Sequence, residues 1–329
     1  MSFRPYGQMV SLLNLRLDKF ILALPSSMKR NLQEYLKFFY RERKKKRSSN
    51  PTRRIQEYWI LLPLWLEQKF RSHVKKRHNP PDRHFLNDIL WAQYCILLQL
   101  TIHDGLYDQH ESNLALIFAA NMLQLEADRI LLKHFERASQ FWKIYQRSMS
   151  DGNNAIIELR SLKTSQNPEP GEILLLHAKA SAIFKIGPAA VCAKMRRMSQ
   201  FASMSIFADE MAKIGQALDD LTDIEQDFGQ GELNYASAFI LQRLEREIPA
   251  RKHALTRIRS VFLGSDVIPQ FFQELRTHFL KARRALQPME IGAASEYFQR
   301  YEAELIAIEE YLYRRQIKLI FHGFTRSSP

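Results

Sequence analysis

The densest group of chemically capable side chains is the segment Asp219-Asp220-Leu-Thr-Asp223-Ile-Glu-Gln-Asp227. Asp219, Asp223 and Asp227 are four residues apart, so on an α-helix they drift only ~40° per step and line one face. Like charges at this spacing destabilise a helix by about 0.2–0.5 kcal/mol per pair, and a bound cation would reverse that effect. Carboxylate oxygens suit Mg²⁺, which proteins usually hold with one or two carboxylates, phosphate oxygens and water. The alternative is a solvated acidic face, but the flanking apolar residues favour partial burial.

A second acidic pair, Asp104 and Asp108, is also spaced by four residues and follows the apolar segment Leu90–Ile102. Alone, such a pair is common in helices and indicates little. If the two acidic helices faced each other with their carboxylates at the same level, they could bind a metal ion between them. Asp104 and Asp108 are candidates for this reason. The alternative is a helix cap and an unrelated surface acid.

The elements that must position these acids are helices. Leu, Ala, Glu, Gln, Lys and Arg dominate, apolar residues recur three and four apart, and no region alternates as a strand would. The predicted breaks are Ser48–Thr52, Asn79–Asp82, Asp151–Asn154, Gln166–Gly171, Gly229–Asn234, Gly264–Asp266 and Gln287–Gly292. The pattern predicts a single all-α bundle of about ten or more helices, with residues 1–84 as N-terminal helices and a basic hairpin of the same bundle, and 85–329 as its catalytic part.

Charge is unevenly distributed. The 329 residues carry a net charge of +13, and the segment 41–84 contains 14 Lys/Arg against 4 Asp/Glu, which gives +10. A uniformly basic nucleic-acid surface is therefore not expected; the segment 41–84 contacts anionic lipid peripherally or forms a solvated hairpin. The longest apolar run, Ile60–Leu66, is far shorter than the roughly 20 residues of a membrane span. With two cysteines and no secretory signal pattern, we expect a cytoplasmic protein, soluble or peripheral to a membrane.

Three segments, in this order, carry a family resemblance. Leu100-Thr-Ile-His103-Asp104-Gly105-Leu-Tyr-Asp108 resembles the first aspartate-rich motif, LIHDDxxD, and Lys179-Ala-Ser-Ala-Ile-Phe184 resembles a KTAxLF segment. Gln216-Ala-Leu-Asp219-Asp220-Leu-Thr-Asp223 resembles the second motif, FQxxDDxxD, and Asp227 continues it. Over roughly residues 85–245 the chain is thus similar to the trans-polyprenyl diphosphate synthase branch of the class I isoprenoid synthases, whose fold terpene synthases share.

The resemblance implies an antiparallel helix bundle with a central apolar cavity, several Mg²⁺ ions that bridge a prenyl diphosphate, and a homodimer. The implied metal ligands are Asp104, Asp108, Asp219, Asp220, Asp223 and Asp227, and Asp104, Asp108, Asp219 and Asp223 are the implied catalytic residues. Lys179 is expected to contact the substrate diphosphate. Arg300-Tyr301 resembles a late Arg-Tyr pair of bacterial terpene synthases that donates to the diphosphate, although a surface Arg beside a core Tyr would give the same dipeptide.

Several positions depart from the family pattern. Gly105 replaces the second Asp of the first motif, and Gln109-His110 stands where an Arg-Arg pair is usual. Gly215 precedes Gln216 in place of Phe, and the Gly-Lys that normally follows the second motif reads Gly229-Gln230-Gly231-Glu232. The missing basic groups normally hold isopentenyl diphosphate and help to bind the allylic diphosphate. Ordinary chain elongation by the usual site is therefore not expected.

A carbocation formed from the substrate would need an apolar cavity with aromatic faces, since a ring face attracts a cation by about 0.5–2 kcal/mol. The expected cavity residues are Tyr107, Phe184, Gly215 and Gln216, and further aromatic candidates are Tyr94, Phe118, Phe207 and Phe228. Plain core packing is the alternative for each of these rings.

Three functions stay open from the sequence. The favoured one is a terpene synthase that ionises a prenyl diphosphate with Mg²⁺ and lets the cation cyclise or lose a proton. The second is a trans-prenyltransferase that condenses isopentenyl diphosphate with an allylic diphosphate. The third is a non-catalytic prenyl-binding partner subunit, which the incomplete first motif would suit.

Overall fold

The computed structural model describes residues 4–47, 58–73, 83–107, 112–165, 168–243 and 266–326, and within these ranges it contains helices and no strand. The α-helices are α1 (Arg4–Ala23), α2 (Ser26–Arg47), α3 (Tyr58–His73), α4 (Arg83–Tyr107), α5 (Leu116–His134), α6 (Gln140–Lys163), α7 (Pro170–Ala180), α8 (Ile186–Lys194), α9 (Phe201–Gln230), α10 (Tyr235–Arg243), α12 (Val267–Leu286) and α13 (Gly292–Arg326). Three 3-10 helices are η2 (Ser181–Lys185), η3 (Met198–Gln200) and η4 (Gln287–Met289). The predicted all-α class is confirmed; the isoprenoid synthase bundle with a central cavity stays a prediction.

The chain divides into two compact units. Unit 1 comprises Met1–Asn50, Glu57–Asn153 and Ser181–Ala208, and unit 2 comprises Pro51–Gln56, Asn154–Ala180 and Asp209–Pro329. The domain assignment made from the sequence, 1–84 and 85–329, stays a prediction. The first acidic pair belongs to unit 1, and the acids of α9 belong to unit 2.

In unit 1, α4 is the central helix and packs along α5. Most of its side chains from Phe85 to Ile102 are buried, so α4 is apolar around nearly its whole circumference. Helix α1 is apolar on one side only: its buried residues recur every four positions, and they are Met9, Leu13, Leu17 and Ile21. The pattern of apolar residues in each helix therefore reflects how much of its surface is buried: nearly all of it in α4 and one side in α1.

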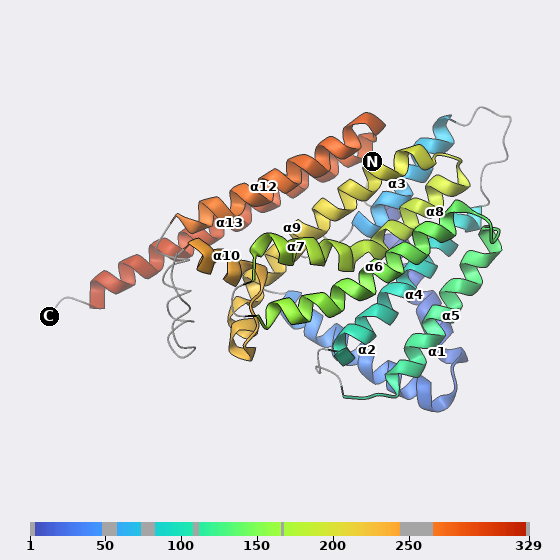
Figure 1. Cartoon of the computed structure of the whole chain (residues 1–329), viewed down its shortest axis with the longest axis horizontal. Coiled ribbons are helices and arrows are strands. Elements are labelled where there is room, and N and C mark those ends of the chain that lie inside the picture. Colours follow the sequence, from blue (N-terminus) through green and yellow to red (C-terminus); the bar gives the residue numbers. More distant parts are fainter. Residues whose placement is uncertain are drawn as a thin grey trace. The chain divides into compact units, whose positions relative to one another are not determined.

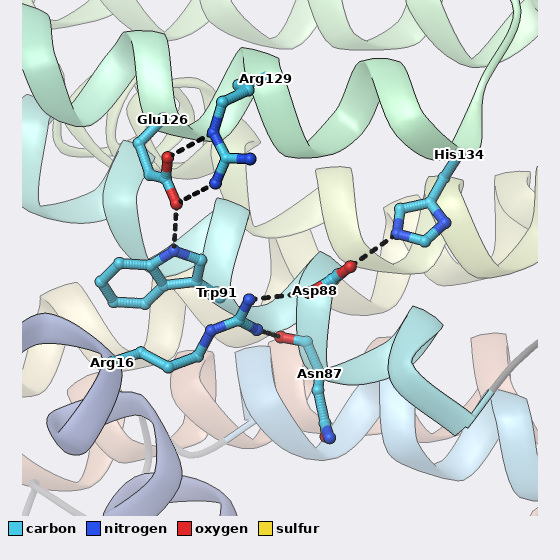
Figure 2. Close-up of polar contacts among 7 residues, drawn as sticks. All are labelled: Arg16, Asn87, Asp88, Trp91, Glu126, Arg129 and His134. Carbon is cyan, nitrogen blue, oxygen red and sulfur yellow. Dashed lines mark hydrogen bonds and ion pairs between the residues drawn. The ribbon is translucent and has the colours of Figure 1, made fainter. Parts of the chain in front are cut away.

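Polar contacts fasten α1 and α5 to the first half of α4 (Figure 2). Arg16 of α1 donates to the Asn87 carbonyl at 2.9 Å and to Asp88 Oδ1 at 2.8 Å, and His134 Nε2 of α5 lies 3.0 Å from Asp88 Oδ2. A second cluster joins Trp91 Nε1 to Glu126, which also binds Arg129. These ion pairs fix the register of α4, whose other end carries Asp104.

The buried side chain of Gln93 links three helices of unit 1. Pro63 lies inside α3 and has no N–H, so the carbonyl four residues earlier, that of Trp59, lacks its helical partner. Gln93 Nε2 donates to this carbonyl at 3.2 Å, and Gln93 Oε1 accepts the Gly187 N–H at 2.6 Å in the first turn of α8. One amide thus satisfies two backbone groups that helix geometry leaves open. A side chain at Gly187 would collide with Gln93 and Pro63, which explains the glycine.

In unit 2, α12 and α13 lie side by side (Figure 1). Phe279 of α12 contacts the rings of Phe298 and Tyr301 of α13, with centroids 5.5 and 5.6 Å away. Phe271, on α12 as well, contacts Tyr235 and Phe239 of α10. Helix α9 is tied to α12 by a buried carboxylate, Glu210, which binds Lys213 Nζ and His278 Nδ1 at 2.6 Å each. These contacts hold the helix that carries the acidic segment.

The predicted breaks at Gly229–Asn234 and Gln287–Gly292 separate helices as expected, and α7 begins at Pro170 inside the break predicted there. The break predicted at Asp151–Asn154 is wrong, because α6 continues through it. Gly152 is itself buried and falls on the same stripe as Tyr145, Ser148, Ala155 and Leu159, so it belongs to the buried face of the helix and does not end it. Ser48–Thr52 and Asn79–Asp82 lie outside the described residues, as does most of Gly264–Asp266.

Within the described residues, two segments are long and apolar enough to cross a membrane, His84–Tyr107 and Pro170–Lys194. Their apolar windows are 72% and 61% buried inside the protein, as core helices of a globular protein would be. Of the basic segment 41–84, residues 48–57 and 74–82 lie outside the described residues, and the side chains of 41–47 are likewise not described.

Candidate functional site

The acids of α9 differ in their exposure to solvent. Asp219, Asp223 and Asp227 are half-buried, whereas Asp220 is only 3% exposed. We call Asp219, Asp223 and Asp227 the acidic row. Leu218 and Leu221, also buried, anchor this part of α9 from its apolar side. The row therefore lies at the boundary between the core of unit 2 and its surface, where a carboxylate is partly desolvated and still within reach of a ligand.

Asp220 supports the start of α10. Its Oδ2 accepts the Tyr235 N–H at 2.7 Å, and its Oδ1 accepts a hydrogen bond from Gln216 Nε2 at 2.6 Å. A carboxylate at a helix N-terminus satisfies a backbone N–H that the helix itself cannot pair, and it interacts favourably with the helix dipole. Both oxygens of Asp220 thus have protein donors, and Gln216, expected from the sequence to line the cavity, is one of them.

Asn234 connects α10 to the acidic row. It is the N-cap of α10, since its Oδ1 accepts the Ser237 N–H at 2.9 Å. Its Nδ2 lies 2.8 Å from the Asp220 carbonyl oxygen and 2.9 Å from Asp227 Oδ2, and donates to both. The side chain of Asp227 is therefore held through one oxygen, at the end of the row where α9 stops.

Negative charge is crowded at this end of α9. Burial raises the pKa of Asp220 to about 6, against the opposing effects of Lys163, Gln216 and the Tyr235 N–H. Burial also raises the pKa of Asp227; Asp223 and Glu232 add to the rise, while Asn234 and Lys163 oppose it. A cation at the row would relieve both the desolvation and the repulsion.

Lys163 is a residue that the sequence analysis missed. It ends α6, and its positive charge acts on both Asp220 and Asp227. No motif marks it, because its proximity to α9 arises from a backbone contact between distant parts of the chain. The only available signal was a lysine in the last turn of a helix, which is a common feature.

The first acidic pair is described only in part. Asp104 is exposed in the last turn of α4, and Asp108 lies outside the described residues. His103 is half-buried; burial lowers the pKa of its imidazole, and Gln99 Nε2 lies 3.3 Å from its Nδ1. His103 and Asp104 thus lie in the last turn of α4, and Tyr107 is exposed one turn further on.

Phe184, the last residue of the KTAxLF-like segment, lies in η2 and belongs to an aromatic cluster of unit 1. Trp59 stacks between Tyr94 and Phe184, with ring centroids 6.1 and 6.2 Å away. Tyr58 contacts Phe184 and Phe207 edge to face. Of the other sequence candidates, Phe118 is exposed on α5 and Phe228 is buried in unit 2. Gly215 is buried in α9.

The basic candidates for binding a diphosphate have different surroundings. Lys179 is exposed at the end of α7. Tyr301 is 1% exposed and stacks on Phe279 of α12 at 5.6 Å, and Arg300 lies over the Tyr297 ring at 5.8 Å. This is the environment expected of a core tyrosine with a neighbouring arginine on the rim of the α12–α13 pair.

Within unit 2, the structure brings together Asp219, Asp220, Asp223, Asp227 and Gln216 on one helix. Among the described residues, no three side chains of His, Cys, Asp or Glu gather closely enough to hold a metal ion by themselves. Mg²⁺ beside phosphate groups is commonly held by one or two carboxylates, with water and phosphate oxygens as its other ligands, so such a cluster is not a requirement for binding this ion.

Comparisons of the chain with protein-family models, with curated proteins and with solved structures find no match.

Proposed function

We propose that this protein is a terpene synthase that ionises a prenyl diphosphate with the help of Mg²⁺ and lets the resulting carbocation cyclise or lose a proton. The observation that carries the proposal is the acidic row, which is half-buried on α9 while the adjacent Asp220 is withdrawn to hold α10. The order of the three family-like segments and the all-α fold support it.

The residues fit the ion that the resemblance implies. Asp219, Asp223 and Asp227 supply hard oxygen ligands. Burial raises the pKa of Asp227, with a smaller contribution from Asp223, and a divalent cation would offset both effects. Asp104 and Asp108 would supply the ligands of the first motif. When bound, Mg²⁺ neutralises the charge that develops on the departing diphosphate. Asp220, which the resemblance also implies as a ligand, is 3% exposed and supports the start of α10 through its hydrogen bonds with Gln216 and the Tyr235 N–H.

The chain's own groups divide the remaining tasks. Lys179 and Arg300 supply positive charge that binds the diphosphate, with Tyr301 beside Arg300. Aromatic rings such as Phe184 shield the cation, since their faces stabilise positive charge without offering a nucleophile. His103, neutral at pH 7 because burial lowers its pKa, is the candidate base for the terminating deprotonation.

The test uses the purified full chain with Mg²⁺ and geranyl, farnesyl or geranylgeranyl diphosphate, each with and without isopentenyl diphosphate. We expect hydrocarbon or alcohol products from an allylic substrate alone. Longer diphosphates formed only when both substrates are present would replace the proposal with a prenyltransferase. The absence of any turnover would favour a non-catalytic prenyl-binding subunit.

Two variants test the assignment of the row. Asp223→Asn should reduce turnover by a hundredfold or more, because an amide is a weaker ligand for Mg²⁺ and removes a charge from the metal site. Asp151→Asn is the matched control, since it makes the same chemical change at an exposed position of α6. The ion pair that Asp151 forms with Arg147 lies on the surface, so its loss should cost little stability. Equal effects of the two variants on turnover would contradict the assignment.

A further inference from the structure

Lys163 is placed beside the acidic row by the backbone. It is the last residue of α6, and its carbonyl accepts the Leu233 N–H at 2.9 Å. Leu233 belongs to the loop 231–234 that joins α9 to α10. The same loop returns to the row, since the Glu232 N–H donates to the Asp227 carbonyl at 2.9 Å and Asn234 donates to the Asp227 carboxylate. The end of α6 and the end of the row are thus held on one short loop.

The side chain of Lys163 is half-buried where α6 meets the loop 231–234. Its charge opposes the burial that raises the pKa values of Asp220 and Asp227 on α9, and it adds to the burial that lowers the pKa of His177 on α7. His177 Nε2 is buried and has no hydrogen-bond partner in the described part of the chain. Among the described residues, no carboxylate lies within ion-pair distance of the Lys163 ammonium. The cation is therefore close enough to influence the acids while its own donors stay open to a ligand.

A diphosphate needs such a cation here. Even with Mg²⁺ bound, its outer oxygens carry negative charge and require donors from the protein. In the family that this sequence resembles, a lysine after the second motif serves this end, and here that position reads Gly229-Gln230-Gly231-Glu232. Lysine suits the task because it is a compact point charge with three donors on a flexible stem. Since Lys163 is hydrogen-bonded to the very loop that lacks the lysine, it can supply the missing charge from another helix.

We propose that Lys163 binds the substrate diphosphate at the acidic row and replaces the basic residue that loop 231–234 lacks. This inference rests on the proposed function. The competing interpretation is structural: a lysine at the C-terminus of α6 stabilises the helix dipole and offsets the charge of the buried acids. The two interpretations differ because only the first requires loss of anion binding when the folded protein loses the charge.

The probe is inorganic pyrophosphate with Mg²⁺, and its binding to the full chain is measured by isothermal titration calorimetry. Lys163→Gln should weaken binding by about ten- to hundredfold, the range for losing one charged hydrogen bond. Lys163→Arg should retain most of the affinity, because the charge stays. Lys143→Gln is the matched control, since Lys143 is an exposed lysine of the same helix and lies about 30 Å along it from Lys163. Thermal melting of each variant shows whether it is folded at the temperature of titration.

The outcomes separate this inference from the proposed function. If the wild type and Lys163→Gln bind pyrophosphate equally while Asp223→Asn has lost binding, Lys163 is structural and the proposed function stands. If Lys163→Gln melts at a lower temperature but binds as tightly as the wild type, the inference also fails. If the wild type binds no pyrophosphate in the presence of Mg²⁺ and turns over no allylic diphosphate, the proposed function itself is refuted.

Discussion

Replacing Asp220 by Asn should make the protein more stable at neutral pH, although it alters a buried residue of the most conspicuous motif. Asn has nearly the same shape, and its Oδ1 can accept the Tyr235 N–H as Asp220 Oδ2 does. The Gln216 amide can turn so that its oxygen accepts from the new amide group, which preserves the second contact. The substitution therefore removes a buried charge while keeping its hydrogen bonds.

The size of the effect follows from the pKa of Asp220. Burial raises it from 3.8 to about 6, so the folded protein binds a proton more tightly than the unfolded chain. Ionisation of Asp220 then lowers stability as pH rises from about 4 through about 6, and the loss is complete above that range. Because each tenfold change in proton affinity corresponds to about 1.4 kcal/mol, the ionised carboxylate costs the folded state about 3 kcal/mol at pH 7.

Urea unfolding of the wild type and Asp220→Asn, followed by circular dichroism in EDTA from pH 4 to pH 8, measures this difference. We expect the variant to be more stable by up to about 3 kcal/mol at pH 7, with the gap closing near pH 4. Taking the difference at each pH cancels the titration of other groups. A gap that does not change with pH, or a variant that is less stable at pH 7, would refute the reasoning. Turnover with Mg²⁺ should fall far less than in Asp223→Asn.

Three further perturbations test other parts of the fold. Glu210→Gln should lower the free energy of unfolding by about 3 kcal/mol at pH 7, because His278 and Lys213 lower the pKa of Glu210 to about 2. This contribution to stability is present above pH 4.5 and disappears as pH falls towards 2. Chemical denaturation should therefore show the stabilities of the wild type and the variant converging in acid. Gln93→Leu should cost about 2–5 kcal/mol in the same assay, since it leaves two buried backbone groups unpaired, and an effect below about 1 kcal/mol would show that the bridge is dispensable. Gly187→Ala should lower the melting temperature and cost about 1–3 kcal/mol, because its methyl group would lie 2.8 Å from Pro63 Cγ, and an unchanged melting curve would contradict that close approach.

The helices could be predicted from the sequence because they depend on local periodicity. Apolar spacing marked the helices, and the break at Gly229–Asn234 coincided with turn-forming residues. The error at Asp151–Asn154 came from assigning a local meaning to Gly152. Gly152 lies on the buried stripe of α6, and the residues on either side continue that stripe, so the helix runs through this position.

Contacts between helices could not be predicted in the same way. Nothing near Gln93 in the sequence indicates that it completes the hydrogen bonding of Trp59 and Gly187, because the need arises only when α3, α4 and α8 meet. Lys163 is a comparable case, since a backbone hydrogen bond to Leu233 brings it to the acids across many intervening residues. In both cases the side chain has an ordinary position in its own helix.

The two adjacent acids of the second motif have separate tasks for a reason that helix geometry supplies. Successive residues point about 100° apart, so Asp219 and Asp220 must face different surroundings even though the motif names them together. Asp227, seven residues after Asp220, returns to within about 20° of it, whereas it is turned by about 80° from Asp219. That explains why Asn234 reaches both the Asp220 carbonyl and the Asp227 carboxylate. The Asp227 end of the acidic row therefore lies next to the start of α10. Asp220 holds the Tyr235 N–H there, and Asn234 of the same helix start holds the carboxylate of Asp227. Asp219 and Asp223 lie further round the helix from Asn234, so the acid of the row that α10 holds is Asp227.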